Sequence, residues 1–323
     1  MGFDKSRGRR SGLRLTELRR HVSLSPNVYR NKIAIRGVGM SLVVKPLSPA
    51  LGAEIGGVDL REDLSAETVA AVVEAWHQHL VIVFRNQSLS EDEQIRFARH
   101  FGVLQERRRP AEARNEASKL KHPEMTMLVS NIRENGKLIG SLADGEMHFH
   151  SDFCYLERPA KGTFLYAIEI PSQGGDTLFL NMYKAYETLP PALRARIEGR
   201  KAVNAYHYES PTREVNEAQL DFSANPHFAQ PIVRTHPDTG RKALYVNRLM
   251  TWTVEGMDKG EGGALLDQLF TFMEQDEFIY AHKWRVGDLV LWDNRCTLHA
   301  RTDFSDKERR LLRRHVVAGD RAY

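Results

Sequence analysis

The spacing of apolar residues along the chain predicts many short strands and a few helices. Leu80-Val-Ile-Val-Phe84 is a continuous apolar run, which is typical of a strand that is buried on both faces. Helical spacing follows two N-cap serines, Ser65 and Ser90. Further helices are expected at residues 183–189, 191–197 and 262–273, and further strands at residues 41–47, 51–60, 125–131, 163–170, 177–180, 231–234, 243–246, 278–284, 289–292 and 311–317.

Most of the expected strands lie after residue 125 and most are short, which favours a mainly β fold with helices packed outside. We expect a β-sandwich or barrel that forms one continuous domain over residues 40–323. Two polar segments without a periodic pattern, residues 105–124 and 209–227, interrupt this domain. Each is interpreted either as a lid over a site or as a solvated surface loop.

The composition narrows the class of protein. With 41% hydrophobic and 27% charged residues, the 323-residue chain resembles a soluble globular protein. No apolar run approaches the ~18 residues of a membrane helix, and the N-terminus lacks the apolar region of a secretory signal. Cys154 and Cys296 are the only cysteines, which fits a reducing compartment. We therefore expect a cytoplasmic protein without a membrane partner, and a homodimer or homotetramer stays open.

The positive charge is concentrated at the N-terminus. Residues 1–40 hold ten of the 46 Lys and Arg residues but two of the 42 Asp and Glu residues, so residues 41–323 retain 36 basic and 40 acidic residues, a net charge of −4. We interpret residues 1–39 as a basic, flexible extension that the domain does not need. The alternatives are a nucleic-acid arm and a transit-like segment. The acidic remainder does not favour nucleic acid as a partner.

The most informative stretch runs from Glu146 to Leu156 and contains His150-x-Asp152. Side chains two apart on a strand share a face, so His150 and Asp152 would project together, with His148 beside them if the strand begins early enough. His299 is the candidate for a third ligand. Two histidines and one carboxylate on one side of an ion form the ligand set of non-haem Fe(II) oxygenases. The motif His-x-Asp alone is common by chance, so this interpretation depends on its surroundings.

The last expected strand carries arginines on both faces. By a period of two, Arg310 and Arg314 share one face, while Arg313 lies on the other. If Arg310 and Arg314 face the interior, each buried guanidinium requires an anion, and a bound ligand with carboxylates would supply it. If they face outward, they pair with surface acids. The spacing alone leaves both alternatives open.

Several segments, in the same order, resemble the Fe(II)/2-oxoglutarate-dependent dioxygenases of the TauD/TfdA family (taurine dioxygenase and 2,4-dichlorophenoxyacetate dioxygenase). The resemblance covers roughly residues 41–320 and implies a double-stranded β-helix, a distorted jelly roll with the metal between its two sheets. The matching segments are Gly52-Ala-Glu-Ile-Gly-Gly-Val-Asp-Leu60, His150-Ser-Asp152, Pro171-Ser-Gln-Gly-Gly-Asp-Thr-Leu-Phe179, Val233-Arg-Thr-His-Pro237, Trp292-Asp-Asn-Arg295 with His299, and Arg309-Arg310 with Arg314.

The resemblance implies a role for each matching residue. Three of them, His150, Asp152 and His299, would bind Fe(II). Thr177, 27 residues after the first histidine, and Arg310, eleven residues after the last, would bind the distal carboxylate of 2-oxoglutarate. Arg314 would bind the acidic group of the primary substrate. The implied reaction uses O2 to hydroxylate a small organic acid while 2-oxoglutarate is decarboxylated to succinate and CO2.

The chain departs from the taurine branch of the family at two places. Gln105-Glu-Arg107 stands where that branch carries histidines, and Glu146 replaces an asparagine four residues before the first metal histidine. We therefore expect an aryloxyalkanoate, a carboxylate or another sulfonate rather than taurine, and Glu146 is counted among the substrate-binding residues. Two alternatives stay open: a metal-binding jelly-roll protein without oxygenase activity, and a macromolecule hydroxylase that docks through the basic tail.

Overall fold

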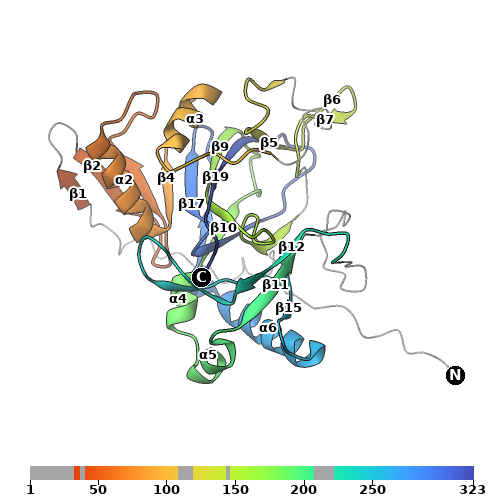
Figure 1. The fold of residues 1–323 in the computed structure, drawn as a ribbon. Helices are drawn as coiled ribbons and strands as arrows, with labels where there is room; N and C mark the ends of the chain where they lie inside the picture. Colours follow the sequence, from red (N-terminus) through yellow and green to blue (C-terminus); the bar gives the residue numbers. More distant parts are fainter. Residues whose placement is uncertain (1–32, 37–40, 108–118, 143–145, 207–221) are drawn as a thin grey trace.

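The structure is a computed structural model of the chain, and it describes residues 33–36, 41–107, 119–142, 146–206 and 222–323. Two sheets pack against each other in this part of the chain (Figure 1). The larger has the strand order β1-β2-β3-β4-β17-β9-β19-β5, and the smaller has the order β16-β10-β18-β8. Two packed, largely antiparallel sheets are the jelly-roll arrangement that the sequence predicted.

Each sheet combines strands that are far apart in the sequence. The larger contains β1 (Ile33–Arg36), β2 (Ser41–Pro46), β3 (Ala53–Gly56), β4 (Val81–Phe84), β5 (Met127–Ser130), β9 (Ala160–Glu169), β17 (Leu289–Asp293) and β19 (Leu311–Ala318). The smaller contains β8 (Met147–His150), β10 (Thr177–Asn181), β16 (Ile279–His282) and β18 (Thr297–Arg301). Beside them lie a sheet of β11 (Lys201–Ala205), β12 (His227–Pro231) and β15 (Thr251–Val254) and the pairs β6 (Arg133–Glu134) with β7 (Lys137–Leu138) and β13 (Val233–Thr235) with β14 (Lys242–Leu244).

Alternating side chains of the larger sheet belong to two apolar cores. In β4, Val81 and Val83 pack in the core between the two sheets, whereas Ile82 and Phe84 pack in a second core with the helices α2 and α3. The continuous apolar run at this strand is thus explained, because both of its faces are covered. The helices are α2 (Ala66–His79), α3 (Glu91–Arg99), α4 (Met182–Glu187), α5 (Pro191–Ile197) and α6 (Lys259–Met273), with a short 3-10 helix, η4 (Asp276–Phe278).

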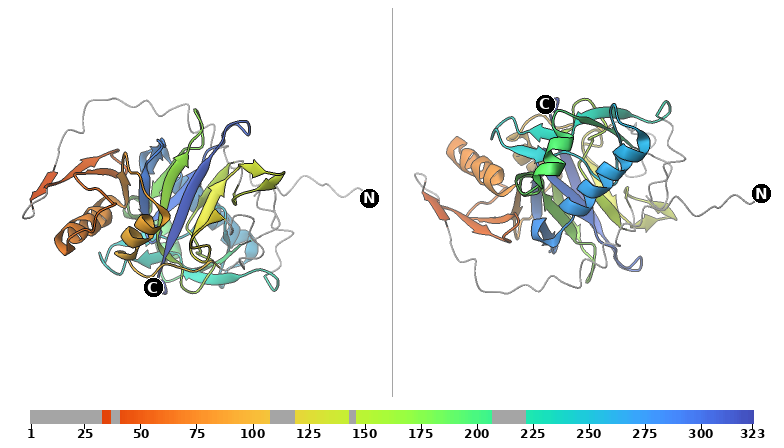
Figure 2. Two further views of the ribbon diagram at one scale, coloured as in Figure 1. Left: turned by 90° about the horizontal axis from the view of Figure 1, so that it is seen from above. Right: turned by 90° about the horizontal axis from the view of Figure 1, so that it is seen from below.

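The helices divide between two sides of the molecule. Views from above and below separate α2 and α3 from α4, α5 and α6, which lie near the third sheet (Figure 2). The predicted helix starts are confirmed: Ser65 Oγ accepts from the backbone N–H of Thr68, and Ser90 forms a capping box with Glu93. These caps fix where the chain turns from the sheet into the helices that cover its outer face.

Three described strands, β11, β15 and β18, were not predicted, and regular structure begins earlier than expected. β18, which carries His299, was not predicted, because Thr-Leu-His-Ala-Arg is short and has few apolar residues. Ile33–Arg36 pairs with Ser41–Val44, so regular structure begins inside the segment that was interpreted as a flexible extension. The basic residues of positions 1–32 lie outside the described residues, as do residues 108–118 and 207–221, which hold most of both predicted lids. Among the described helices, none has the length and apolar character of a membrane span.

Candidate active site

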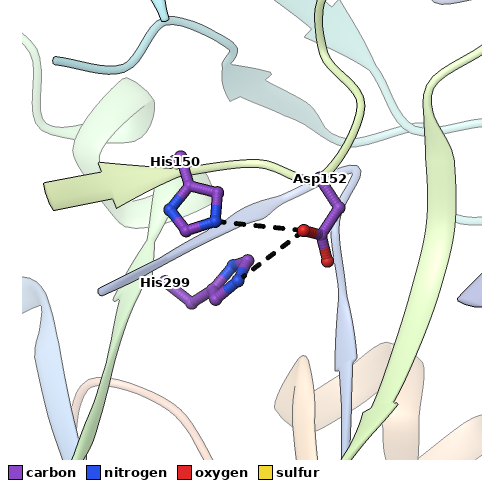
Figure 3. A group of neighbouring side chains, drawn as sticks. All are labelled: His150, Asp152 and His299. Atoms are coloured by element: carbon purple, nitrogen blue, oxygen red, sulfur yellow. Dashed lines mark ion pairs between the residues drawn. The ribbon is translucent and has the colours of Figure 1, made fainter. Parts of the chain in front are cut away.

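The three candidate metal ligands come from two neighbouring strands of the smaller sheet and the turn that follows one of them. His150 is the last residue of β8, His299 is the middle residue of β18, and the two residues pair directly across the antiparallel ladder. Asp152 lies in the turn after β8. The three side chains point toward one another (Figure 3). The structure therefore brings together the three residues that the sequence proposed as ligands.

The arrangement of their donor atoms fits one metal ion. Asp152 Oδ1 lies 3.9 Å from Nε2 of His150 and 3.9 Å from Nε2 of His299, and all three donors lie within 4.8 Å of one another. His150 Nδ1 lies 2.9 Å from the carbonyl oxygen of His148, which only accepts, so Nδ1 carries the proton and Nε2 carries the lone pair. Two imidazoles and a carboxylate are the donor set of a non-haem Fe(II) site.

The surroundings favour the protonation states that bind metals. Burial lowers the pKa of His299 well below its usual range, and the neighbouring His150 adds to this effect, so the imidazole is neutral. Burial alone would raise the pKa of the Asp152 carboxyl, but the Arg314 guanidinium and the hydrogen bond from Thr163 outweigh it and hold that pKa well below its usual range. Both ligands are thus ready to bind a cation without releasing a proton.

The common strand face predicted for His150 and Asp152 is wrong, because β8 ends at His150. Hydrogen bonds with Thr163 and Asn294 orient the Asp152 carboxylate instead. Thr163 Oγ1 donates to Asp152 Oδ2 at 2.6 Å, and the backbone N–H of Asp152 donates to Asn294 Oδ1 at 3.3 Å. Asn294 Nδ2 donates in turn to Thr163 Oγ1 at 2.9 Å. The sequence did not identify either residue, although Asn294 belongs to the Trp-Asp-Asn-Arg segment that carried the resemblance.

Arg310 contacts the segment that leads into β10, the strand next to β18. Thr177 is the first residue of β10 and pairs with Arg301 of β18, and Arg310 Nη2 donates to the carbonyl oxygen of Gly175 at 3.3 Å. Arg310 is 2% exposed, and its Nε has no hydrogen-bond partner among the described residues. Burial lowers the pKa of Arg310 to about 9; Arg301 adds to the shift, and the Asp176 carboxylate offsets a smaller part of it. A charged guanidinium that is buried with unused hydrogen-bond donors is stabilised by an anion.

A glycine allows the guanidinium of Arg310 to approach the start of β10. Gly175 has a φ of +64°, which favours glycine, and a Cβ built on it would lie 3.1 Å from Arg310 Nε. A larger residue at position 175 would therefore strain the backbone and press against the guanidinium. Gly175 thus leaves room for the Arg310 side chain just before β10.

Arg314 extends from β19 to the candidate ligands. Its Nη2 lies 2.7 Å from Asp152 Oδ1, its Nη1 lies 3.5 Å from Met127 Sδ, and its guanidinium carbon lies 5.8 Å from the centre of the Phe153 ring. Arg310 is buried and Arg314 pairs with Asp152, so the alternative in which both arginines face outward and pair with surface acids is wrong. The anion that pairs with Arg314 is the carboxylate of a candidate metal ligand.

Two further predicted residues have weaker links to the site. Glu146 directly precedes β8 and is half-buried, and within the described residues no hydrogen bond or ion pair joins it to Arg314 or to the candidate ligands. His148 contacts His150 through its backbone carbonyl oxygen. Besides Thr163 and Asn294, a third residue was missed: Trp284 Nε1 donates to Thr177 Oγ1 at 3.0 Å. The sequence holds no signal for this indole contact, because Trp284 follows a different strand.

A second cluster of metal-type side chains, His236, Asp293 and Cys296, has its donor atoms already engaged. Arg295 donates to both carboxylate oxygens of Asp293, at 2.8 and 2.6 Å. The backbone N–H groups of residues 238 and 239 donate to His236 Nδ1, so its Nε2–H donates to Asp293 at 3.0 Å. Burial raises the pKa of the Cys296 thiol well above its usual range. This cluster is a structural network rather than a metal site.

A jelly-roll fold that carries two histidines and one carboxylate as candidate ligands is typical of non-haem metalloenzymes. The chain belongs to the family described as "Taurine catabolism dioxygenase TauD, TfdA family", which matches residues 44–315. It is a 2-oxoglutarate-dependent dioxygenase with a jelly-roll fold, so the predicted fold and enzyme class are confirmed.

The similarity extends over nearly the whole length of the following three relatives. The alpha-ketoglutarate-dependent 2,4-dichlorophenoxyacetate dioxygenase of Cupriavidus pinatubonensis is 36% identical over 298 residues, which are 87% of this chain and 99% of that protein. Pentalenolactone F synthase of Streptomyces avermitilis is 34% identical over 286 residues, 84% and 92% of the two chains. The crystal structure of AAD-2 in complex with Mn(II) and N-oxalylglycine has a TM-score of 0.71 and 28% sequence identity, covering 88% of this chain and 99% of that chain.

Proposed function

We propose that this dioxygenase binds Fe(II) with His150, Asp152 and His299, and the distal carboxylate of 2-oxoglutarate with Arg310 and Thr177. The observation that carries the proposal is the convergence of three metal donors within 4.8 Å in a site with a buried guanidinium that requires an anion. The donor set suits Fe(II). A relative whose solved complex contains Mn(II) and N-oxalylglycine supports the same assignment.

The proposed primary substrate is a small organic acid with an apolar, preferably aromatic, body. Arg314 would bind the acid group through its planar fork of donors, and the apolar side chains of Phe153 and Met127 flank the guanidinium. An aryloxyalkanoate satisfies both requirements, and a relative that is 36% identical is named for its action on 2,4-dichlorophenoxyacetate. Glu146 is proposed as a further substrate contact, suited to a hydroxyl or cationic group.

In the proposed reaction the chain binds, orients and shields the reactants. Fe(II) held by the three ligands would supply the activation of O2 that couples decarboxylation of 2-oxoglutarate to hydroxylation. Arg310 and Thr177 fix one end of the co-substrate, and Arg314 fixes the acid of the substrate, so both reactants are held in one geometry. Trp292, which is 1% exposed and has its ring 4.7 Å from that of His299, keeps water from the ligand side.

The proposed substrate class is tested by matched pairs of compounds that differ in charge. Purified enzyme with Fe(II), O2 and 2-oxoglutarate is assayed for succinate with phenoxyacetate, a phenoxypropionate, an alkyl carboxylate, an alkyl sulfonate and the methyl ester of each carboxylate. We expect aryloxy acids to give the highest succinate formation and their esters to give none above background. Equal turnover of acid and ester would remove Arg314 from its role, and preference for compact sulfonates would contradict the aromatic body.

Trp284→Phe is expected to weaken 2-oxoglutarate binding without slowing the reaction at saturation. The indole N–H occupies one acceptor site of the Thr177 hydroxyl, so the hydroxyl hydrogen is directed elsewhere and can reach a carboxylate. Loss of one hydrogen bond of about 0.5–1.5 kcal/mol corresponds to a KM for 2-oxoglutarate that is ~2–10-fold higher. The measurement is succinate formation as a function of 2-oxoglutarate concentration.

Trp252→Phe is the matched control for this variant. Trp252 is also buried, and its Nε1 donates to a backbone carbonyl, that of Ala205, at 3.1 Å. We expect its loss to leave the KM for 2-oxoglutarate unchanged. A decrease of kcat in Trp284→Phe with an unaltered KM would show that the indole acts on another step.

A further inference from the structure

The Asp152 oxygen that faces both imidazoles also contacts a cationic side chain. Asp152 Oδ1 lies 3.9 Å from Nε2 of His150 and of His299, and 2.7 Å from Nη2 of Arg314. A metal ion held by the three ligands would contact the same oxygen. A guanidinium and a divalent cation at one carboxylate oxygen repel each other and share its negative charge. Arg314 therefore opposes the metal at the same position where the metal is to be bound.

Arg314 is not needed to orient the carboxylate. Thr163 Oγ1 holds the other oxygen, Oδ2, at 2.6 Å, and Asn294 Oδ1 accepts from the backbone N–H of Asp152 at 3.3 Å. Thr163, Asn294 and Asp152 are buried, whereas the Arg314 side chain is 13% exposed. The hydrogen bonds that set the ligand geometry are therefore independent of the guanidinium, and the effect of Arg314 on the metal is mainly one of charge.

The contacts of Arg314 leave it able to change partners. Arg314 Nη1 contacts the thioether sulfur of Met127, a weak acceptor, and the Asp152 carboxylate is the only anionic contact of Arg314 among the described residues. Arg313, the next residue on β19, is instead tied to Gln94 Oε1 and to the backbone carbonyl of Leu89, each at 2.7 Å. An incoming carboxylate could offer Arg314 a bidentate pair in place of its single bond to Asp152.

We propose that Arg314 couples metal binding to binding of the substrate's acid group: the guanidinium weakens the metal site through Asp152 Oδ1, and an anion bound to Arg314 relieves this effect. The inference rests on the proposed function, because it uses the proposed metal ligands and the proposed substrate arginine. Coupling between two ligands is reciprocal, so the metal also strengthens binding of the anion. The enzyme thereby holds metal most tightly when its acidic substrate is present.

The test measures metal affinity rather than activity. Mn(II) is titrated into full-length protein, with free Mn(II) followed by its electron paramagnetic resonance signal, in the absence and presence of phenoxyacetate. We expect Arg314→Gln to bind Mn(II) ~10-fold more tightly than the unaltered protein, within the usual range of coupling between sites. Phenoxyacetate is expected to tighten Mn(II) binding by at least ~5-fold in the unaltered protein and to have no effect in Arg314→Gln.

Two control variants separate charge competition from positioning. Thr163→Val removes the hydrogen bond to Asp152 Oδ2 and is expected to weaken Mn(II) binding, since partners that orient a ligand typically contribute ~10–100-fold. Arg61→Gln removes the same charge from a surface ion pair with Asp59 and is expected to leave Mn(II) affinity unaltered. The variants at positions 163 and 314 thus change the affinity in opposite directions.

Weaker or unchanged Mn(II) binding in Arg314→Gln would overturn the coupling, because a positioning role predicts loss. If that variant does not fold, the phenoxyacetate effect on the unaltered protein decides: tighter Mn(II) binding supports the coupling, and unchanged binding contradicts it. Failure of the unaltered protein to bind Mn(II) at all would instead refute the proposed metal site, and with it the inference. The two failures are therefore distinguishable.

Discussion

Replacing Arg310 with methionine is expected to abolish 2-oxoglutarate binding while stabilising the protein in the absence of this co-substrate. Arg310 is 2% exposed and its Nε has no hydrogen-bond partner among the described residues, so its charge is poorly compensated. An apolar side chain of similar length removes this cost, and such replacements of buried charges often raise stability by ~1–4 kcal/mol. The same change leaves the distal carboxylate of 2-oxoglutarate without its cation, which weakens binding by ~100-fold or more.

Thermal unfolding with Mn(II) present, with and without 2-oxoglutarate, measures both effects. Co-substrate at a hundred times its Kd should stabilise the unaltered protein by ~2.7 kcal/mol and Arg310→Met by at most ~0.4 kcal/mol. Arg313→Met is the matched control, since Arg313 is also buried but donates to Gln94 and to backbone carbonyls. It should destabilise the protein and leave the stabilisation by 2-oxoglutarate intact. An Arg310→Met protein that 2-oxoglutarate still stabilises by ~2.7 kcal/mol would contradict the proposed role.

Replacing His150 with alanine is expected to weaken metal binding by more than ~100-fold and to reduce succinate formation to background. Residues that only orient a ligand contribute ~10–100-fold, and loss of a donor atom removes more than that. His150 Nε2 lies 3.9 Å from Asp152 Oδ1. Without this nitrogen only His299 and Asp152 remain as ligands, and two ligands bind the ion more weakly than three. Equilibrium titration with Mn(II) and an assay of succinate at saturating Fe(II) measure the two consequences.

His148→Ala is the control for this variant, two residues away on the same strand. The contact of His148 with His150 is made by its backbone carbonyl oxygen, which alanine retains. Metal affinity should therefore stay within about threefold of the unaltered protein, a free-energy change below ~0.7 kcal/mol. Comparable losses in the two variants would mean that the assignment of the first ligand rests on the wrong histidine.

The sequence could predict the parts of the site that depend on residue type and spacing. The His-x-Asp pair and the later histidine were identified from their residue types, since the strand face assumed for Asp152 is wrong and β18 was not predicted. A period of two placed Arg310 and Arg314 on one face and left open whether that face is interior. The buried strand β4 was predictable from its continuous apolar run. Family resemblance supplied the order of the segments and the role of Thr177.

The remaining features depend on contacts between distant segments. The Thr163–Asn294 pair holds Asp152 through hydrogen bonds that join three segments, and the Trp284 indole meets Thr177 from another strand. β8 ends at His150 because a turn follows, so the prediction that Asp152 projects from the same strand face as His150 was wrong. Nor could spacing reveal that Arg314 pairs with Asp152, because that ion pair crosses from one sheet to the other.

The central claim is that His150, Asp152 and His299 hold Fe(II) next to a 2-oxoglutarate site formed by Arg310 and Thr177. Its most direct test is an anaerobic titration of the unaltered protein with Fe(II) and then 2-oxoglutarate, followed by visible absorption. The account predicts a charge-transfer band that grows to one equivalent of each and is lost in His150→Ala. No band in the unaltered protein, or the same band in the variant, would contradict it.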